Sequence, residues 1–458
     1  MLNKNKSHSK DLTNLNEWLC YLETIHNTEI DLGLARISQV AKALHIDFSF
    51  AQVITVAGTN GKGTTCAFLE NALLGETITD FNKCNRLQTV AVYSSPHIEN
   101  FNERLRINKK DIDDKSLIKA FEKIEIARGE ISLSYYEFTT LAAFLALMEA
   151  KPDIIILEVG LGGRLDATNI INADVSVITT VDLDHQAFLG NDRETIGFEK
   201  AGIMRGNQHI IIGDPEAPQS VIHYAENVNA NVDFSFREKA LNKIKIRNYD
   251  FFSEETDQGW QWQYNEVDEN KKKTQYNLSK LIATKIPQDN VVTALMVLNQ
   301  LGVRLTTTKV NKLITQTQVA GRTEIFKGSG SKCDVMLDVG HNPHAGRYLA
   351  KKLLHFKAQY EYSRIIAVVA MLCDKDIANT LIPFNGIIDD WFIAPLTVPR
   401  AASVEQMTKE LTSFTNSINC FDNITQAFKM ANINAEPSDL ILVFGSFYTV
   451  AEIRQLII

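Results

Sequence analysis

The chain lacks long apolar runs and has no excess of positive charge. No apolar stretch approaches the ~20 residues that a helix needs to cross a bilayer. Residues 1–19 are polar and mixed in charge, without the apolar centre of a secretion signal. The formal net charge is −8 and the pI is about 5.8, which argues against nucleic acid or an anionic membrane surface as the main partner. We therefore expect a cytoplasmic protein that binds neither.

Cysteine is scarce and scattered. The 6 cysteines form no Cys-x-x-Cys pair and no tight group with histidine. Such spacing is typical of reduced thiols and does not favour disulfides or a zinc site. With 458 residues, of which 45% are hydrophobic, the chain exceeds the length at which single cores stop growing. Two domains are expected.

A glycine-rich loop stands between an apolar run and a helix-like stretch. The run at residues 53–56 is followed by Gly58, Thr59, Asn60, Gly61, Lys62, Gly63, Thr64 and Thr65. Backbone N–H groups of such a loop and the helix N-terminus hold phosphate, and the lysine reaches the outer phosphates. A hydroxyl of Thr64 or Thr65 can ligate Mg²⁺. Because no glycine lies five residues before Gly61, the loop departs from the usual Walker spacing, and a simple glycine-rich turn is the alternative.

Short β-branched runs alternate with helix-length amphipathic stretches along the chain. This pattern is typical of parallel sheets with crossover helices. The predicted strands are residues 53–56, 90–93, 154–159 and 175–180 in a first domain, and 335–339, 365–372, 391–394 and 440–444 in a second. The predicted helices include residues 137–150, 309–318, 404–414 and 425–432. The helix at 309–318 closes the first domain, so we assign residues 1–320 and 321–458 to the two domains and expect a ligand site between them.

Residues 237–281 have a different pattern. Trp260, Trp262 and Tyr264 alternate with polar residues, and a charged run follows at residues 268–273. Alternation of this kind predicts a hairpin or a small antiparallel appendage. Its aromatic side chains are expected to form one packed face.

A second glycine-rich segment follows an apolar run that ends in an acid. Glu158 ends the run, and Gly160, Gly162 and Gly163 come next. Open α/β sheets place their ligand chemistry at the carboxyl ends of the strands, and Mg²⁺ prefers one or two carboxylates with phosphate and water. Glu158 is therefore a candidate magnesium ligand, with a satisfied acid at a strand end as the alternative.

Two further candidates follow the next apolar run. His185, in Leu183-Asp184-His185, is either a hydrogen-bonded structural imidazole or a metal ligand. Lys200, followed by Ala201 and Gly202, either stays cationic beside phosphates or is chemically modified.

Taken in order, these segments resemble the folylpolyglutamate synthase and dihydrofolate synthase family, a branch of the Mur ligase superfamily. The resemblance is carried by residues 58–65, 94–97, 102–104, 136–138, 158–169, 183–185, 199–202, 321–322 and 338–343. It covers nearly the whole chain, and residues 30–36 and 394–396 are most similar to bifunctional bacterial members. The resemblance implies an α/β chain with a P-loop, Mur-ligase-like ATP-binding domain and a smaller Rossmann-like C-terminal glutamate ligase domain.

The resemblance also implies roles for individual residues. ATP would be bound by Thr59, Asn60, Gly61, Lys62, Gly63, Thr64, Asn290, Arg322 and Asp338. Ser95 and Glu158 would bind one Mg²⁺ and His185 a second, so two metal sites are expected. The implied catalytic residues are Lys62, Lys200 as a carbamate, and His341 near the γ-phosphate. Dihydropteroate would contact Asp31, Leu32, Gly33, Leu34, Ser134, Tyr135, Tyr136, Glu137, Leu165, Asp166 and Ala167.

The implied activity is an ATP-dependent carboxylate–amine ligation. L-Glutamate would be added to dihydropteroate, giving dihydrofolate, and to reduced folates, giving folylpolyglutamates. Phosphoryl transfer from ATP makes the carboxylate reactive as an acyl phosphate, while Mg²⁺ and Lys62 neutralise charge. Closure of the two domains would exclude water from that intermediate. We expect the substrates to be small molecules and the protein to be a monomer.

Two of the candidate dihydropteroate contacts are carboxylates that can accept hydrogen bonds from the pterin ring. Asp31 and Glu137 suit its amino and ring N–H groups, while Tyr135, Tyr136 and Leu34 offer flat or apolar walls. The structural alternative is that Asp31 caps a helix beginning near Leu34.

Other functions stay open. Polyglutamylation alone is one, and a cell-wall ligase acting on a UDP-linked sugar is another, although residues 31–36 and 136–138 favour a pterin. A GTP-binding switch that makes no bond is the alternative from another class, and it is expected to carry an Asn-Lys-x-Asp guanine signature.

The chain departs from the family pattern at several positions. Residues 75–89 are longer than the usual turn and predict a surface insertion. Val291 and Val292 stand where alanines are common, so the adenine wall is expected to differ. Gly340 replaces a common alanine, which is expected to loosen the backbone without removing a functional group.

Overall fold

The protein is described from a computed structural model, which covers residues 12–28, 30–76, 88–237, 250–267, 273–328 and 331–458. The chain divides into two compact units. Unit 1 contains residues 1–181 and 193–317, and unit 2 contains residues 182–192 and 318–458. The chain therefore enters unit 2 for a short segment before it returns to unit 1. The inserted part of residues 75–89, namely 77–87, lies outside the described residues.

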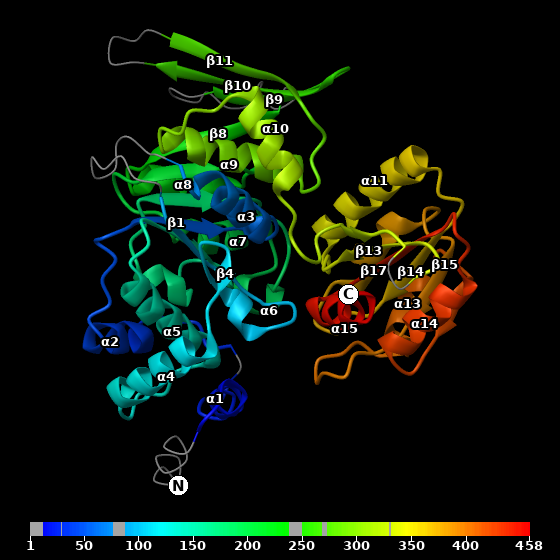
Figure 1. Ribbon diagram of the computed structural model, residues 1–458, viewed down its shortest axis with the longest axis horizontal. Coiled ribbons are helices and arrows are strands. Elements are labelled where there is room, and N and C mark those ends of the chain that lie inside the picture. Colours follow the sequence, from blue (N-terminus) through cyan, green and yellow to red (C-terminus); the bar gives the residue numbers. More distant parts are fainter. Residues whose placement is uncertain (1–11, 29, 77–87, 238–249, 268–272, 329–330) are drawn as a thin grey trace. The chain divides into compact units, whose positions relative to one another are not determined.

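Unit 1 is built on one eleven-stranded sheet (Figure 1). Its strand order is β11-β10-β9-β8-β7-β6-β1-β5-β2-β3-β4. The parallel centre consists of β1 (Gln52–Ala57), β2 (Val90–Tyr93), β5 (Ile154–Glu158), β6 (Val175–Ile178), β7 (His209–Ile212) and β8 (Asn231–Arg237). Every residue of β1, β2, β5 and β6 is buried, which explains their continuous β-branched sequences.

The remaining strands extend this sheet at both edges. β3 (Leu105–Ile107) and β4 (Lys110–Asp111) add an antiparallel hairpin beside β2. On the other side, β9 (Asp250–Thr256) runs parallel to β8, and β10 (Gly259–Val267) and β11 (Lys273–Leu281) follow as antiparallel strands. The antiparallel pairing predicted within residues 237–281 is therefore present, but it continues the main sheet. Residues 238–249 and 268–272 lie outside the described residues.

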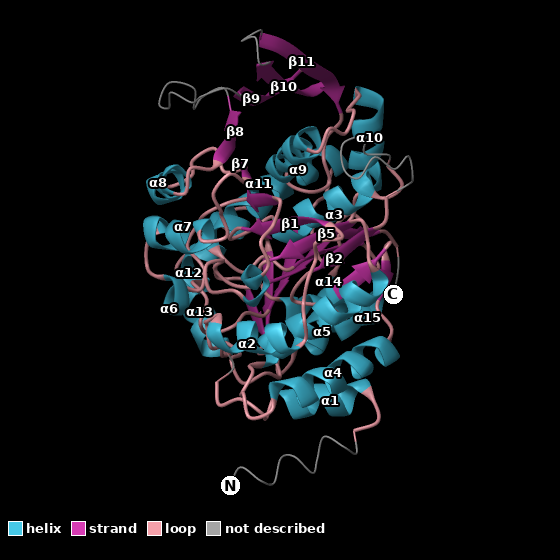
Figure 2. Ribbon diagram, turned by 90° about the vertical axis from the view of Figure 1, so that its left-hand side faces the viewer, coloured by secondary structure: helices cyan, strands magenta, loops and turns pink. Residues whose placement is uncertain are grey.

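Helices cover the sheet of unit 1. α1 (Leu15–Leu22), α2 (Ala35–Ala43), α4 (Asp114–Arg128) and α5 (Tyr135–Ala150) share one apolar core and lie together in Figure 2. α5 is buried on most sides and also packs on side chains of β1, β2 and β5. The other helices are α3 (Lys62–Leu73), α7 (Arg193–Ala201), α8 (Gln219–Asn227), α9 (Gln288–Gln300) and α10 (Thr307–Gln316).

Unit 2 contains a six-stranded sheet in the order β12-β13-β17-β14-β15-β16. β13 (Asp334–Asp338), β14 (Ile365–Val369), β15 (Asp390–Ile393), β16 (Ile418–Cys420) and β17 (Leu440–Phe444) are parallel, and β12 (Glu324–Phe326) is antiparallel to β13. Its helices are α6 (Gln186–Leu189), α11 (Pro343–Tyr360), α12 (Ile377–Leu381), α13 (Val404–Leu411), α14 (Ile424–Asn434) and α15 (Phe447–Ile457). The predicted α/β class is confirmed for both units.

One stretch matches the guanine signature expected of a GTP-binding switch. Residues 108–111 read Asn-Lys-Lys-Asp, and they form the turn between β3 and β4. Asn108 and Lys109 adopt positive φ angles of 51° and 63°, and Asn108 Oδ1 accepts a hydrogen bond from Val90 N at 3.0 Å. Because Val90 begins β2, this turn lies at the amino edge of the parallel strands, opposite to the edge where such sheets bind ligands. The stretch is a hairpin turn.

Within the described parts of the chain, each helix is too short or too polar to span a bilayer.

Candidate active site

The phosphate loop, residues 58–65, connects β1 to α3. Gly61 is the N-cap of α3 and has a φ of 86°. A Cβ added at Gly58 would lie 1.9 Å from Thr179 Oγ1, and one at Gly61 would lie 2.4 Å from Asn290 Oδ1. Neither position can therefore carry a side chain without displacing a neighbour. The loop is also tied to the end of the β6 segment, since Thr59 N donates to Thr180 O at 2.7 Å and Asn60 N donates to Thr180 Oγ1 at 3.0 Å.

Lys62 lies back over this loop. Its Nζ donates to Gly58 O at 2.9 Å and to Thr59 O at 3.4 Å. These two carbonyls hold the ammonium against the loop. The arrangement presents positive charge where a phosphate chain would lie.

Asn290 supports the loop from α9. Its Nδ2 donates to Thr64 Oγ1 at 2.7 Å, and the residue is buried. Thr64 Oγ1 in turn donates to Gly61 O at 3.0 Å. Val291 and Val292 follow Asn290 and are buried in the core. The extra volume of these two valines, compared with alanine, is therefore accommodated inside unit 1.

Glu158 lies against the phosphate loop. It is the last residue of β5 and pairs with Val56 of β1 in the sheet register. A Cβ added at Gly63 would lie 3.6 Å from both of its carboxylate oxygens. Ser95 follows β2, the other neighbour of β5, at a cis Ser95–Pro96 bond. Glu158, Ser95 and the phosphate loop thus gather at the carboxyl edge of the parallel strands.

The glycine-rich segment after β5 is shaped by Asp166. Its Oδ2 accepts from Gly160 N at 3.0 Å and from Leu161 N at 2.9 Å, and its Oδ1 accepts from both the N and the Oγ1 of Thr168. Burial raises the pKa of Asp166, although these hydrogen bonds oppose the rise. The carboxylate is thus occupied in folding the segment that carries Leu165 and Ala167.

Lys200 lies at the end of α7, which packs on the same glycine-rich segment. A Cβ at Gly163 would lie 3.0 Å from the carbonyl oxygens of Glu199 and Lys200. Arg164 N also donates to Glu199 O at 2.7 Å. Lys200 is itself buried, at 3% exposure. The structure therefore brings Lys200 to the glycine-rich segment within unit 1, whereas His185 belongs to unit 2.

The candidate pterin residues are joined by Arg36, which the sequence interpretation did not include. Arg36 NH1 lies 2.7 Å from Asp31 Oδ2, and Arg36 NH2 lies 3.2 Å from Glu137 Oε2. Glu137 also forms a capping box with Ser134 at the start of α5, while its buried Oε1 has no hydrogen bond from any residue that the structure describes. Such an oxygen is suited to an N–H donor of a bound ring.

Asp31 does not cap α2. The N-cap of that helix is Leu34, and no side chain bonds there. Instead, Asp31 Oδ2 is shared between Arg36 and His26 Nε2, the latter at 3.1 Å. The capping alternative is therefore wrong, because the carboxylate points to Arg36 and His26.

Tyr136 lies beside the same group. A Cβ at Gly160 would lie 2.7 Å from its hydroxyl oxygen, so the ring covers the glycine-rich segment. Burial raises the pKa of Tyr136 well above its ordinary value. Tyr136 thus connects the residues around Asp31 to the segment that begins at Glu158.

In unit 2, the predicted nucleotide residues lie around the end of β13. Asp338 Oδ1 accepts from Gly340 N at 2.7 Å, and its Oδ2 accepts from Thr323 N at 2.8 Å. Burial raises the pKa of Asp338, and the neighbouring Arg322 opposes this effect. Arg322 also lies 5.2 Å from the ring centre of Phe447. The carboxylate therefore joins the turn after β13 to the segment before β12.

The Asp184 cluster of unit 2 contains Asp184, His341, Asn342 and Lys375. Lys375 Nζ lies 2.7 Å from Asp184 Oδ1, Asn342 Nδ2 donates to Oδ2 at 3.0 Å, and His341 Nε2 lies 3.6 Å from Oδ2. Burial raises the pKa of Asp184, but the neighbouring His341, Lys375 and His185 outweigh it and hold the pKa well below its ordinary value. Of this cluster, the sequence assigned a role to His341 alone, although Asp184 and Asn342 lie in segments that carry the family resemblance.

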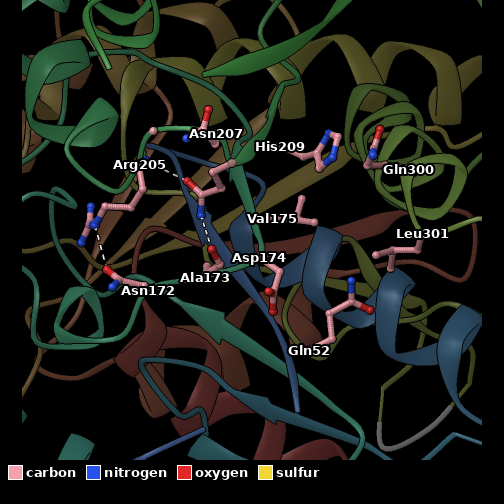
Figure 3. A pocket seen from close by; sticks show the side chains of 12 residues that line it. Gln52, Asn172, Ala173, Asp174, Val175, Arg205, Asn207, His209, Gln300 and Leu301 are labelled. Atoms are coloured by element: carbon pink, nitrogen blue, oxygen red, sulfur yellow. Dashed lines mark hydrogen bonds between the residues drawn. The ribbon is translucent and has the colours of Figure 1, made fainter. Parts of the chain in front are cut away.

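A cavity of about 500 Å³ lies elsewhere in unit 1 (Figure 3). It is lined by the first residues of β1, β6 and β7, and thus lies at the amino edge of the sheet. Arg205 in its wall already donates to five acceptors on Asn169, Asn172, Gly202 and Met204. The cavity is separate from the phosphate loop, and its arginine is committed to the protein.

Comparisons with known proteins agree with this geometry. The family model "Mur ligase middle domain" matches residues 56–297, and "Mur ligase, glutamate ligase domain" matches residues 321–447. The class defined by both parts of the chain is that of the Mur ligases.

A curated relative from Escherichia coli (strain K12), dihydrofolate synthase/folylpolyglutamate synthase, is 39% identical over 97% of this chain and 95% of its own. The solved structure of E. coli FolC with DHPP and ADP has a TM-score of 0.82 at 39% identity, covering 97% of this chain and 98% of that one. A bifunctional folylpolyglutamate synthase/dihydrofolate synthase with Mn, AMPPNP and L-glutamate has a TM-score of 0.81 at 38% identity, with coverage of 97% and 98%. The chain belongs to the dihydrofolate synthase/folylpolyglutamate synthase family of Mur ligases, which confirms the resemblance seen in the sequence.

Proposed function

We propose that the chain is an ATP-dependent ligase that adds L-glutamate to dihydropteroate and to reduced folates. The observation that carries the proposal is the position of Glu158 against Gly63 of the phosphate loop, with Lys62 held over that loop. The relatives support the substrate classes, since they are named for both activities and their solved structures contain ADP or AMPPNP, Mn and L-glutamate.

The chemistry requires a carboxylate to become an acyl donor. The substrate carboxylate attacks the γ-phosphorus of ATP and ADP leaves, which gives an acyl phosphate. The amine of glutamate then attacks the acyl carbon, the C–O bond to phosphate breaks, and the nitrogen loses a proton. Lys62 is placed to offset the charge that develops on the transferred phosphoryl group.

A divalent metal suits the donors beside the loop. Within the described residues, no three His, Cys, Asp or Glu side chains gather as metal ligands. We propose that Glu158 and Ser95 hold Mg²⁺ together with phosphate oxygens, because this ion prefers few carboxylates and keeps water or phosphate as its other ligands. The ion would supply charge neutralisation for phosphoryl transfer. For unit 2 we propose His185 as a ligand of a second ion, Arg322 and Asp338 as nucleotide contacts, and His341 beside the transferred group.

The test is phosphate release with ATP, glutamate and one acceptor at a time. We expect release with dihydropteroate and with tetrahydrofolate, and none with a UDP-linked sugar. Release with tetrahydrofolate alone would reduce the function to polyglutamylation. Phosphate release with the UDP-linked sugar would show that the acceptor is a cell-wall precursor and not a folate.

Lys200 is proposed to act as a carbamate, which would turn a buried cation into an anion near the metal. Lys200→Ala should then lower turnover by about 10²-fold or more, in the range seen when preorganised charge is removed. A small carboxylic acid added to the buffer should restore part of the activity, since it replaces the missing anion. Crystal density for an unmodified Lys200 in an active, metal-loaded enzyme would contradict this role.

A further inference from the structure

Lys375 places a buried positive charge on the segment that carries His185. Its side chain is only 7% exposed, and that of Asp184 only 9%. Burying an ammonium is costly unless it is paired, and removing one partner of such a pair leaves an uncompensated charge. The Lys375–Asp184 contact at 2.7 Å provides this pairing, although the two residues are 191 positions apart in the sequence.

The backbone around Lys375 fixes the direction of its side chain. Lys375 lies in the turn between β14 and α12, where its N–H donates to Leu372 O at 3.3 Å and its carbonyl accepts from Ile377 N at 2.9 Å. Asp376 then caps α12 through Asn379 N. A long side chain that starts from a turn held on both sides loses much of its freedom to move, and its ammonium is delivered to one place.

Asp184 transmits this constraint to two candidate catalytic groups. The Oδ1 atom that meets Lys375 also accepts from His185 N at 2.8 Å. His185 has a φ of 49°, a left-handed conformation that is unfavourable for a residue with a side chain and needs such support. The Oδ2 atom faces His341 Nε2, while His341 Nδ1 donates to Val339 O at 2.8 Å. The two oxygens of Asp184 thus orient His185 and His341 at once.

We propose that Lys375 is a positioning residue of the ligase reaction, which holds His185 and His341 in their working arrangement through Asp184. The proposal rests on the proposed function, because the roles of His185 and His341 are taken from it. A purely structural ion pair would stabilise unit 2 without affecting turnover or metal binding.

The first experiment replaces Lys375 by methionine, which keeps the length and removes the charge. Lys375→Met should lower kcat by about 10- to 100-fold, the usual effect of losing a partner that orients a metal ligand. It should leave the KM for either acceptor within about threefold. The affinity for Mn²⁺ in the presence of AMPPNP, measured by electron paramagnetic resonance, should fall by a similar 10- to 100-fold. Lys375→Arg should recover part of both quantities.

The matched control is Lys357→Met. Lys357 also pairs with an aspartate of unit 2, Asp389 at 3.3 Å, but the two side chains are 33% and 40% exposed. This variant should keep wild-type kcat and Mn²⁺ affinity. If Lys375→Met also kept them and lowered only the melting temperature, the pair would be structural and the proposal would be refuted.

A double-mutant cycle with Asp184→Asn tests whether Lys375 affects kcat through Asp184. If Lys375 acts only through Asp184, the double variant should be no slower than the slower single variant, because both remove the same interaction. Losses in kcat that multiply would refute the route through Asp184. Should Lys375→Met fail to fold, Lys375→Arg and Asp184→Asn give the same comparison, with unchanged kcat in both as the refuting result.

Failure of the proposed function gives a different result. A wild-type chain that releases no phosphate with either acceptor refutes the ligase. A wild-type chain that is active, beside an equally active Lys375→Met variant, refutes only the positioning role.

Discussion

The phosphate loop of unit 1 and the Asp184 cluster of unit 2 are built by different means. The loop is made of backbone groups within residues 58–65, and its geometry depends on positions where no side chain fits. The Asp184 cluster is made of side chains from three separate segments, around residues 184, 341–342 and 375. Substitutions that add a side chain to the loop should therefore weaken phosphate binding. The arrangement of the Asp184 cluster should instead be lost when one of its charged side chains is removed.

The largest effect is expected at Lys62, whose side chain belongs to the loop. Lys62→Ala should abolish product formation with every acceptor, since one ATP site serves both reactions, and the loss should be ~10²–10³-fold or more. Phosphate release measures the activity, and circular dichroism establishes that the variant is folded. Near-normal turnover by folded Lys62→Ala would remove the loop from the mechanism.

Gly61 tests whether the loop fails when atoms are added. Gly61→Ala places a methyl group 2.4 Å from Asn290 Oδ1 at a φ of 86°. At Gly302, with a φ of 70°, the added methyl group meets no atom of the described residues within 4 Å. Both variants should lose about 1–2 kcal/mol of unfolding free energy from the left-handed conformation. Only Gly61→Ala should also weaken nucleotide binding, by about tenfold, which corresponds to ~1.4 kcal/mol. Equal nucleotide affinities by calorimetry would show that the contact with Asn290 is unimportant.

A variant at Asp31 tests whether removing a charged side chain from a cluster in unit 1 impairs the reaction, as is expected for the Asp184 cluster of unit 2. Asp31→Ala should raise the KM for dihydropteroate by about tenfold or more, because an unpaired polar partner costs about 1–3 kcal/mol. The KM for ATP should be unchanged, and elongation of tetrahydrofolate should suffer less. Asp47→Ala is the control, since Asp47 bonds to Ser49 in its own turn. Equal losses with both acceptors would argue against a site selective for dihydropteroate.

The free energy of unfolding is expected to depend on pH with opposite signs in the two units. Burial raises the pKa of Asp233 in unit 1 from 3.8 to about 7, so the folded state binds more protons between these values and the free energy of unfolding falls as the pH rises. Burial lowers the pKa of Lys352 in unit 2 from 10.5 to about 8, against the opposing charge of Asp338, so the free energy of unfolding rises with pH over that interval.

Urea unfolding at a series of pH values checks this difference. Asp233→Asn should remove the fall between about pH 4 and 7, and Lys352→Met should remove the rise between about pH 8 and 10.5. Parallel pH curves for wild type and variants would show that these groups keep their ordinary pKa values when folded.

Most strands could be predicted because burial leaves a local pattern. The predicted segments at residues 90–93 and 440–444 coincide with β2 and β17, and the others differ by a few residues at their ends. The eleven-stranded sheet could not be predicted, since the pairing of β8 with β9 depends on contacts that alternation of residue types does not record. For the same reason, the alternation within residues 237–281 predicts a hairpin or a small antiparallel appendage and not a continuation of the main sheet.

The candidate site also contains residues that the sequence predicts and residues that only the three-dimensional structure identifies. The phosphate loop and Glu158 are visible in the sequence because glycine spacing and strand ends are local features. Arg36 stood within a segment already considered, yet its bonds to both Asp31 and Glu137 depend on the packing of α2 against α5. Lys375 lies between two acidic residues after an apolar run, which is a weaker local indication of a functional residue than the segment around Arg36. Its partner Asp184 could be found only in three dimensions.

The passage of the chain through unit 2 at residues 182–192 has a consequence for dividing the gene. A fragment that begins at residue 318 would contain the whole six-stranded sheet, yet it would lack Asp184. Lys375 would then have no carboxylate for its buried charge, and Asn342 and His341 would lose the same partner. Separate expression of the two units at their apparent boundary should therefore give a less stable C-terminal fragment than a design that supplies residues 182–192 as a peptide.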